Sequence, residues 1–173
     1  EEGLLERDFS QFFESFRVRH PERVPSFFTK EEVLRIENSI ARSNAVGKRN
    51  YAMTLLASRL GLRASDIANL KFGEIDWDNN LLTITMQKTR KVIQLPLLAE
   101  VGNSIVDYLK NGRPKSSLDQ VFLSSRAPYT GATKACVCAA INEIILKSGV
   151  DVHLKHHGPH SLRHSLASAM LSE

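Results

Sequence analysis

The sequence has little of what marks membrane or secreted proteins. It contains no run of about 18 apolar residues, the length needed to cross a bilayer, and its first residues do not resemble a signal peptide. Only two cysteines occur, Cys136 and Cys138, and their close spacing disfavours a disulfide between them. These absences indicate a soluble cytoplasmic protein with reduced thiols and no membrane partner.

Extremes of composition are also missing. Hydrophobic residues make up 42% and charged residues 24% of a chain of 173, which excludes wholesale disorder and allows one buried core. The net charge of +4 is concentrated in residues 80–173, which hold 11 Lys and Arg against 6 Asp and Glu. A basic surface of this kind can bind nucleic acid but can also serve solubility alone, so charge leaves both interpretations open.

Hydrophobic spacing predicts a mainly α-helical domain with a small antiparallel β-sheet, an α+β fold. Thr29 and Glu32 match a capping box, which would start the first helix of the domain. Apolar and polar residues alternate from Leu82 to Met86, which predicts a strand. Helices are expected over residues 30–42, 49–60, 65–70, 99–110, 132–147 and 160–171, and strands over 74–77, 82–86 and 92–97.

The N-terminal part of the chain differs from the rest. Apolar residues recur with helical spacing between Leu5 and Phe16, and residues 17–26 carry two prolines and no sustained apolar face. We therefore predict an N-terminal arm and interdomain linker over residues 1–26 and the main domain over residues 27–173.

The most informative motif is the H-S-L-R-H segment at residues 160–164. On a helix, His160, Arg163 and His164 share one face, and Pro159 suits the first helical position. Cationic side chains beside the free amides of a helix N-terminus form a suitable anion site. The alternative is an amphipathic helix whose arginine and histidines make ordinary contacts.

Two further segments are suited to contact an anion. Arg63 follows Gly61, which ends a predicted helix, and Asp66 is close enough to hold the guanidinium in one orientation. Lys88 lies in the polar turn 87–91 between two predicted strands, from which it can reach a DNA groove or a leaving oxygen. The alternatives are an ordinary Arg–Asp pair at a helix start and a solvated lysine on a turn.

In their order and context, these three segments resemble the catalytic domain of tyrosine recombinases, the phage and transposon integrases. That family has an arginine in a G-L-R-x-S-E-like segment, a lysine in a hairpin and a His-x-Leu-Arg-His box. The resemblance runs from about Pro25 to the last residue. In it, Asp66 replaces the more usual glutamate and would support the arginine, and His164 matches the last His of the box, with a structural role. The resemblance assigns the catalytic positions to Arg63, Lys88, His160 and Arg163.

The resemblance implies site-specific DNA recombination, for integration or excision, without a metal or other cofactor. A tyrosine would attack a phosphodiester of double-stranded DNA, forming a 3′-phosphotyrosyl bond and releasing a 5′-hydroxyl. Arg63 and Arg163 would neutralise the non-bridging oxygens as charge builds. His160 would bond the phosphate or assist deprotonation of the tyrosine, and Lys88 would protonate the leaving oxygen. The two arginines and His160 should therefore line one solvent-accessible cavity, while the hairpin lysine stands free to move.

One residue that the resemblance requires is missing. The tyrosine nucleophile of the family follows the box, whereas Tyr51, Tyr108 and Tyr129 all precede it. The N-terminal core-binding domain that usually completes the DNA clamp is also not recognisable. We therefore expect a catalytic-domain fragment that lacks its nucleophile and is inactive alone. The complete protein would act as a homotetramer on DNA in the bacterial nucleoid.

Three other functions fit parts of the pattern. A type IB topoisomerase shares this chemistry and would relax supercoils, and a non-catalytic DNA-binding module would use the same basic face. The histidines between residues 153 and 164 also suggest a zinc site. However, no Cys is nearby, most of these histidines lie in a predicted loop and no H-E-x-x-H motif occurs, so no metal is predicted.

Overall fold

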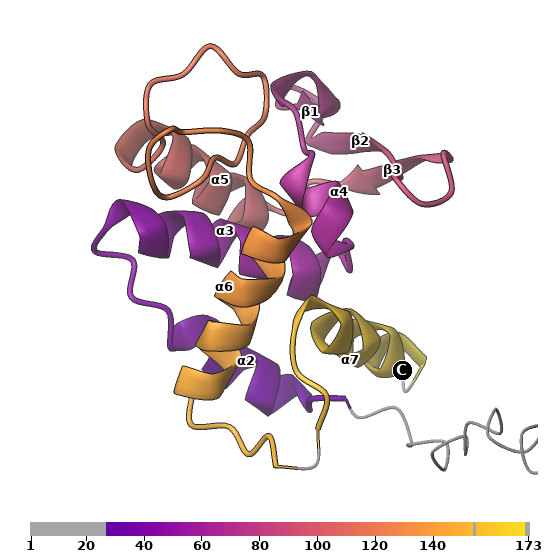
Figure 1. Cartoon of the computed structure of the whole chain (residues 1–173). Coiled ribbons are helices and arrows are strands. Elements are labelled where there is room, and N and C mark those ends of the chain that lie inside the picture. The colour runs from indigo at the N-terminus through magenta and orange to yellow at the C-terminus, as the bar shows by residue number, and fades with distance from the viewer. Residues whose placement is uncertain (1–26, 154, 172–173) are drawn as a thin grey trace, which may run out of the picture.

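The computed structural model describes residues 27–153 and 155–171, so the arm and linker predicted over residues 1–26 lie outside the described residues. The described part consists of helices and a three-stranded antiparallel sheet (Figure 1), which confirms the predicted fold class. The helices are α2 (Lys30–Asn38), α3 (Ala45–Arg59), α4 (Ala64–Ala68), η1 (Phe72–Glu74, a 3₁₀ helix), α5 (Ala99–Asn111), α6 (Lys134–Lys147) and α7 (Pro159–Leu171). The strands are β1 (Ile75–Asp76), β2 (Leu81–Thr85) and β3 (Val92–Pro96).

The first two helices begin at side-chain caps. The predicted capping box forms: the Thr29 hydroxyl accepts the Glu32 amide at 3.2 Å, and the Glu32 carboxylate accepts the Thr29 amide at 2.8 Å. Helix α3 begins at Ala45, earlier than predicted. The reason is Asn44, whose side-chain oxygen accepts the Gly47 amide at 2.8 Å and so caps the helix before its apolar periodicity starts.

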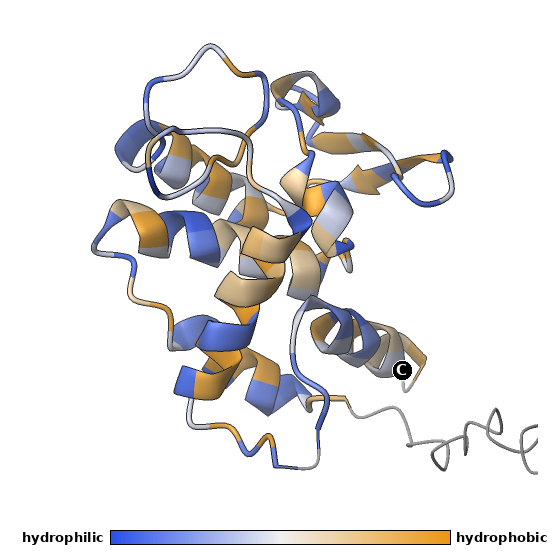
Figure 2. Cartoon of the chain, viewed as in Figure 1, coloured by the Kyte–Doolittle hydropathy of each residue, from blue (hydrophilic) through white to orange (hydrophobic). Residues whose placement is uncertain are grey.

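The sheet has the strand order β1-β2-β3. In the β2–β3 pair, Leu82 lies opposite Leu95 and Ile84 opposite Ile93. Leu82 and Ile84 are buried while Thr83 is exposed, which confirms the predicted alternation. The β2–β3 hairpin extends from the side of the helical body, and its tip is hydrophilic (Figures 1 and 2). The sheet thus buries one face and carries its turn away from the core.

Helix α3 is the centre of the core. It packs against α5, α6 and α7, and its Met53, Leu55 and Leu56 are fully buried. Burying a side chain of this size stabilises the fold by about 1.5–3 kcal/mol. Helix α4 packs on α6, so that both helices are held beside the central one. Among the described residues, no helix is long and apolar enough to cross a membrane.

Candidate active site

Arg63 is positioned by the turn that ends α3. Gly61 has a φ of +62°, and the Leu62 amide donates to the Leu56 carbonyl at 3.1 Å, which closes the end of the helix. Arg63 then takes the extended N-cap position of α4. Its side chain is partly exposed, and Nη1 lies 4.0 Å from the Met86 sulfur at the base of the hairpin. The backbone of Arg63 is therefore fixed while its guanidinium remains accessible.

Asp66 does not hold Arg63 as predicted. No ion pair joins these two side chains, although the structure describes both. Asp66 is 2% exposed, and its Oδ1 instead accepts the backbone amide of Gln87 at 2.9 Å. The spacing of three residues was compatible with the predicted pair, but Asp66 lies on the buried side of α4 and faces the base of the hairpin. Its carboxylate links α4 to the segment that carries the lysine.

Lys88 lies in the turn between β2 and β3, directly after the residue that Asp66 holds. The turn is closed by backbone hydrogen bonds from Met86 to the Lys91 carbonyl at 2.9 Å and from Arg90 to the Met86 carbonyl at 2.8 Å. Lys88 is exposed, as expected for a hairpin tip. The base of the hairpin is thus tied to α4, and the lysine itself is free to reach a bound molecule.

Helix α7 supplies the other two predicted residues from its first turns. It begins at Pro159, and the Ser161 hydroxyl donates to the Gly158 carbonyl at 2.8 Å. Arg163 donates from Nη1 to the Gly61 carbonyl, 102 positions earlier in the chain. The turn at the end of α3 therefore orients both arginines of the site.

These segments meet at one cavity of about 640 Å³. Arg63, Lys88, His160 and Arg163 all line it, which confirms the expected convergence, and Lys88 does not stand apart. None of the described residues that line this cavity is an aspartate or a glutamate. The cavity therefore presents several positive charges that no carboxylate on its wall offsets, an arrangement suited to a phosphate.

The positive surroundings act on the histidine of the site. The pKa of His160 lies below its ordinary value, first because partial burial disfavours the charged imidazolium. The positive charges of His164 and Arg163, on the same helix, and of Arg63 and His156 lower this pKa further. In the absence of a bound anion, the site therefore disfavours a protonated His160.

Helix α6 contributes to the site in a way that the sequence motifs did not predict. Three residues of this helix, each four positions after the last, line the same cavity: Lys134, Cys138 and Asn142. The sequence signal that could have indicated Lys134 is the excess of basic residues over 80–173. In the structure, Lys134 lies at the start of α6, where the Thr133 hydroxyl accepts the Cys136 amide at 3.2 Å. His157, from the loop before α7, also lines the cavity.

None of the three tyrosines, all of which the structure describes, lines this cavity. The Tyr51 hydroxyl donates to Glu100 at 3.3 Å, and the buried Tyr108 hydroxyl accepts the Leu123 amide at 3.4 Å. Tyr129 lines a different cavity. Within residues 27–153 and 155–171, no three His, Cys, Asp or Glu side chains gather in a way that could hold a metal ion.

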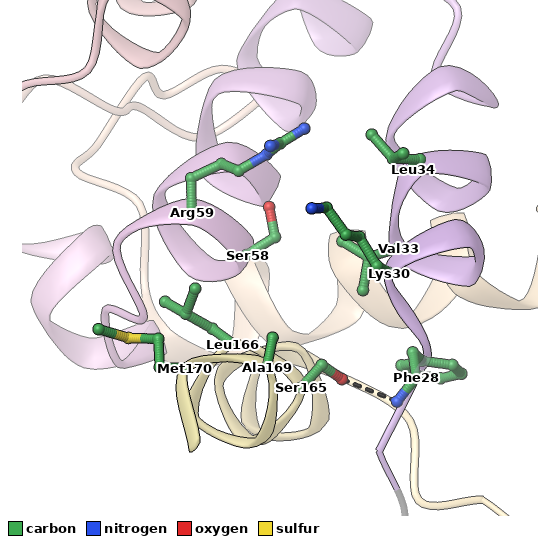
Figure 3. Close-up of a pocket in the computed structure, with 10 residues that line it drawn as sticks. All are labelled: Phe28, Lys30, Val33, Leu34, Ser58, Arg59, Ser165, Leu166, Ala169 and Met170. Carbon is green, nitrogen blue, oxygen red and sulfur yellow. Dashed lines mark hydrogen bonds between the residues drawn. The ribbon is translucent and has the colours of Figure 1, made fainter. Parts of the chain in front are cut away.

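A second cavity, of about 280 Å³, lies between α2, α3 and α7 (Figure 3). Its walls are largely apolar, with Val33 of α2 and Leu166 and Met170 of α7 among the lining side chains. The guanidinium of Arg59 in its wall is paired with the Glu37 carboxylate at 2.6 Å. This cavity therefore lacks the concentration of unpaired cations found in the first.

Comparison with known proteins gives concordant results. A model of the phage integrase family matches residues 26–173. The putative integrase/recombinase y4rA of Sinorhizobium fredii is 38% identical over 149 residues, which are 86% of this chain and 36% of the relative. The putative integrase/recombinase y4gC of the same strain is 30% identical over 149 residues, 86% of this chain and 76% of the relative.

Solved structures share the fold. The XerA recombinase aligns with a TM-score of 0.72 at 21% identity, over 87% of this chain and 52% of that chain. The XerH site-specific recombinase, in a pre-cleavage complex with its difH substrate, aligns with a TM-score of 0.68 at 21% identity, over 87% of this chain and 44% of that chain. The chain therefore spans about a third of y4rA and about half of these structures.

Proposed function

The chain belongs to the phage integrase family of tyrosine recombinases, and from this premise we propose that it is part of the catalytic domain of an enzyme that cuts and rejoins double-stranded DNA at specific sites. The observation that carries the proposal is the single cavity at which cations from four distant segments meet with no carboxylate among the residues that line it. A DNA phosphodiester is the anion that such a cavity suits best. The XerH neighbour, a site-specific recombinase bound to its difH substrate, supports DNA as the partner.

Each side chain has a distinct part in the proposed reaction. Arg63 and Arg163 neutralise the non-bridging oxygens while the phosphorus is five-coordinate, and the shared turn at Gly61 keeps them in place for this. His160 bonds the phosphate or takes the proton of the attacking tyrosine. Lys88 delivers a proton to the leaving 5′ oxygen, a contribution of roughly 10²–10⁴-fold in rate.

The nucleophile of the proposed reaction is a tyrosine outside residues 1–173. The three tyrosines within this range do not line the cavity, and they precede the segment at residues 160–164. Without a nucleophile aligned with the leaving oxygen, the cations alone give little acceleration. We propose that the 173-residue chain binds DNA but does not cleave it, and that the complete protein acts as a homotetramer on DNA in the bacterial nucleoid.

The test is covalent trapping. Nicked duplexes that cover the DNA bordering the protein's own gene are incubated with the complete protein and separated on denaturing gels. A protein–DNA adduct is expected. Arg163→Ala should slow formation of the adduct at least 100-fold, roughly the loss seen when an enzyme loses one hydrogen-bond donor that stabilises the charge of its transition state. Arg126→Ala, which removes an exposed arginine that does not line the cavity, should leave the adduct unchanged.

Two outcomes would contradict the proposal. An adduct with the 173-residue chain alone would point to Tyr51, Tyr108 or Tyr129 as the nucleophile. Relaxation of supercoiled plasmid by the complete protein, without exchange of partners between two DNA molecules, would assign it to the topoisomerase class instead.

A further inference from the structure

His164 lies behind the predicted catalytic histidine. The two residues are one helical turn apart on α7, and their Nε2 atoms are 2.8 Å apart. Their rings meet edge to face, with centroids 4.2 Å apart and planes at 83°. His160 is exposed and lines the cavity, whereas His164 is half-buried and does not line it. His164 therefore contacts His160 and not the cavity itself.

The distance between the two nitrogens restricts their protons. Only one hydrogen fits between Nε2 atoms 2.8 Å apart, so one histidine donates and the other accepts. With Nε2 engaged in this way, Nδ1 is the ring nitrogen of His160 that is left for a molecule in the cavity. When His160 is neutral and accepts at Nε2, its Nδ1 carries a hydrogen; when His160 donates at Nε2, its neutral ring has a bare Nδ1.

The groups around the pair decide when it takes up a second proton. The cavity wall adds positive charge from three sides: Arg63 at the start of α4, Lys88 on the hairpin and Lys134 on α6. Arg163 and His156 add charge next to the pair, and no aspartate or glutamate lines the cavity. A second proton is therefore disfavoured until an anion enters. A bound phosphate offsets this positive charge and, as a nearby anion, favours the charged form of His160.

We propose that His164 is a positioning residue that acts as the hydrogen-bond acceptor for a protonated His160 when a phosphate is bound. In this state, His160 donates from Nδ1 to the phosphate and from Nε2 to a neutral His164. His164 thereby fixes the orientation of the His160 ring and holds its charge, in place of the purely structural role expected from the sequence. The inference rests on the proposed phosphate site and concerns the state of its histidine.

The experiment follows the two histidines in the 173-residue chain by NMR, using ¹⁵N–¹H correlations that report the tautomer of each ring. The chain is titrated with pH in the absence and presence of inorganic phosphate. With phosphate, His160 should carry hydrogens on both nitrogens, and His164 should be neutral with a bare Nε2. In His164→Ala, the pKa of phosphate-bound His160 should fall, and phosphate affinity at pH 6 should drop by roughly 5-fold, the scale of one partly exposed charged hydrogen bond.

His164→Gln is the conservative control, because its side-chain oxygen offers an acceptor and should restore most of the affinity. If the pH titration and tautomer of His160 are the same in His164→Ala and the unaltered chain while phosphate still binds, the inference is overturned and the phosphate site stands. If phosphate perturbs neither His160 nor the two arginines, the proposed function fails at its first step. In that case, the tautomers measured without phosphate still show whether His160 and His164 share one hydrogen between their Nε2 atoms. If the unaltered chain shows no such shared hydrogen, the inference is also rejected.

Discussion

At the residue scale, the site depends on charges that are held apart from any compensating group. Arg59 and Lys48, elsewhere in the molecule, have carboxylate partners at 2.6 and 2.7 Å. Arg63 and Arg163 instead contact a methionine sulfur and a backbone carbonyl, neither of which cancels their charge. A guanidinium oriented by neutral groups keeps its full attraction for a phosphate and loses little entropy when the phosphate arrives.

The lowered pKa of His160 predicts how stability and binding depend on pH. In the folded chain, His160 takes up its proton at lower pH than in the unfolded chain, where the value is about 6.5. As pH falls through 6.5, the unfolded state therefore gains protons first, and the folded state loses stability until the folded pKa is passed. Above this window, His160 contributes no pH dependence.

Phosphate should reverse this trend, because it favours the protonated ring. Affinity for sulfate, which stays a dianion in this range, is expected to rise as pH falls from 7.5 to 5.5. Affinity for inorganic phosphate should show the same rise after correction for its second ionisation, which removes one negative charge from phosphate as pH falls. Isothermal titration calorimetry in two buffers of different ionisation enthalpy measures the proton uptake. His160→Gln should remove the uptake, and an unchanged uptake in that variant would contradict the assignment.

At the element scale, the turn between α3 and α4 holds the site together. Gly61 adopts a left-handed φ of +62°, which side chains disfavour, and a Cβ there would lie 3.3 Å from Leu166 of α7. Gly61→Ala is expected to lower the free energy of unfolding by about 1–2 kcal/mol. It should also displace the carbonyl that binds Arg163 and so weaken phosphate binding. Urea unfolding and calorimetry measure the two effects.

The matched control is Gly73→Ala. A Cβ at Gly73 meets nothing within 4 Å, and its φ lies outside the left-handed region. This variant should unfold within about 0.5 kcal/mol of the unaltered chain, as surface substitutions usually do. If Gly61→Ala and Gly73→Ala lower the free energy of unfolding by the same amount, the left-handed conformation at Gly61 makes no particular contribution to stability.

The link between α4 and the hairpin makes a second prediction at this scale. Asp66→Ala removes the acceptor of the Gln87 amide, and the loss of one such hydrogen bond should lower the free energy of unfolding by about 0.5–1.5 kcal/mol. Hydrogen exchange at the Gln87 amide should become faster, and the hairpin that carries Lys88 should become more mobile. Asp78→Ala, at an exposed turn position, should change neither. If the Gln87 amide exchanges as slowly in Asp66→Ala as in the unaltered chain, Asp66 does not hold the hairpin to α4.

At the scale of the whole molecule, the positive charge gathers where the hairpin, α6 and α7 border one cavity. We expect the 173-residue chain to bind duplex DNA weakly, with little sequence preference and with affinity that falls steeply as salt rises. Each phosphate contact contributes about −0.9 to the slope of log affinity against log salt. Fluorescence anisotropy at several salt concentrations measures this slope.

The lysines of the cavity should each account for part of that slope. Lys88→Ala and Lys134→Ala should each make it shallower by about 0.9. Lys110→Ala, at an exposed position near the end of α5 that does not line the cavity, should leave the slope unchanged. An affinity that does not depend on salt, or no binding at low ionic strength, would exclude DNA as the partner of this surface.

The sequence by itself determined those features that depend on atoms a few positions apart. The capping box at Thr29 and Glu32 formed as predicted, because both hydrogen bonds join residues three positions apart. The alternation at Leu82 and Ile84 identified the buried face of β2, since strand side chains point to opposite sides in turn. Helical spacing likewise placed His160, Arg163 and His164 together, and they lie on α7.

Only the tertiary structure decided which groups those residues meet. Asp66 was within reach of Arg63 along the chain, but the position of α4 next to the base of the hairpin gave it the Gln87 amide, 21 positions away. Arg163 was oriented by a carbonyl 102 positions away, and Lys134 joined the site because α6 packs on α4. Such pairings depend on how buried faces fit against one another, and many distant residues contribute to that fit. No local pattern therefore contains them, whereas the chemistry that they bring together is already present in the order of the residues.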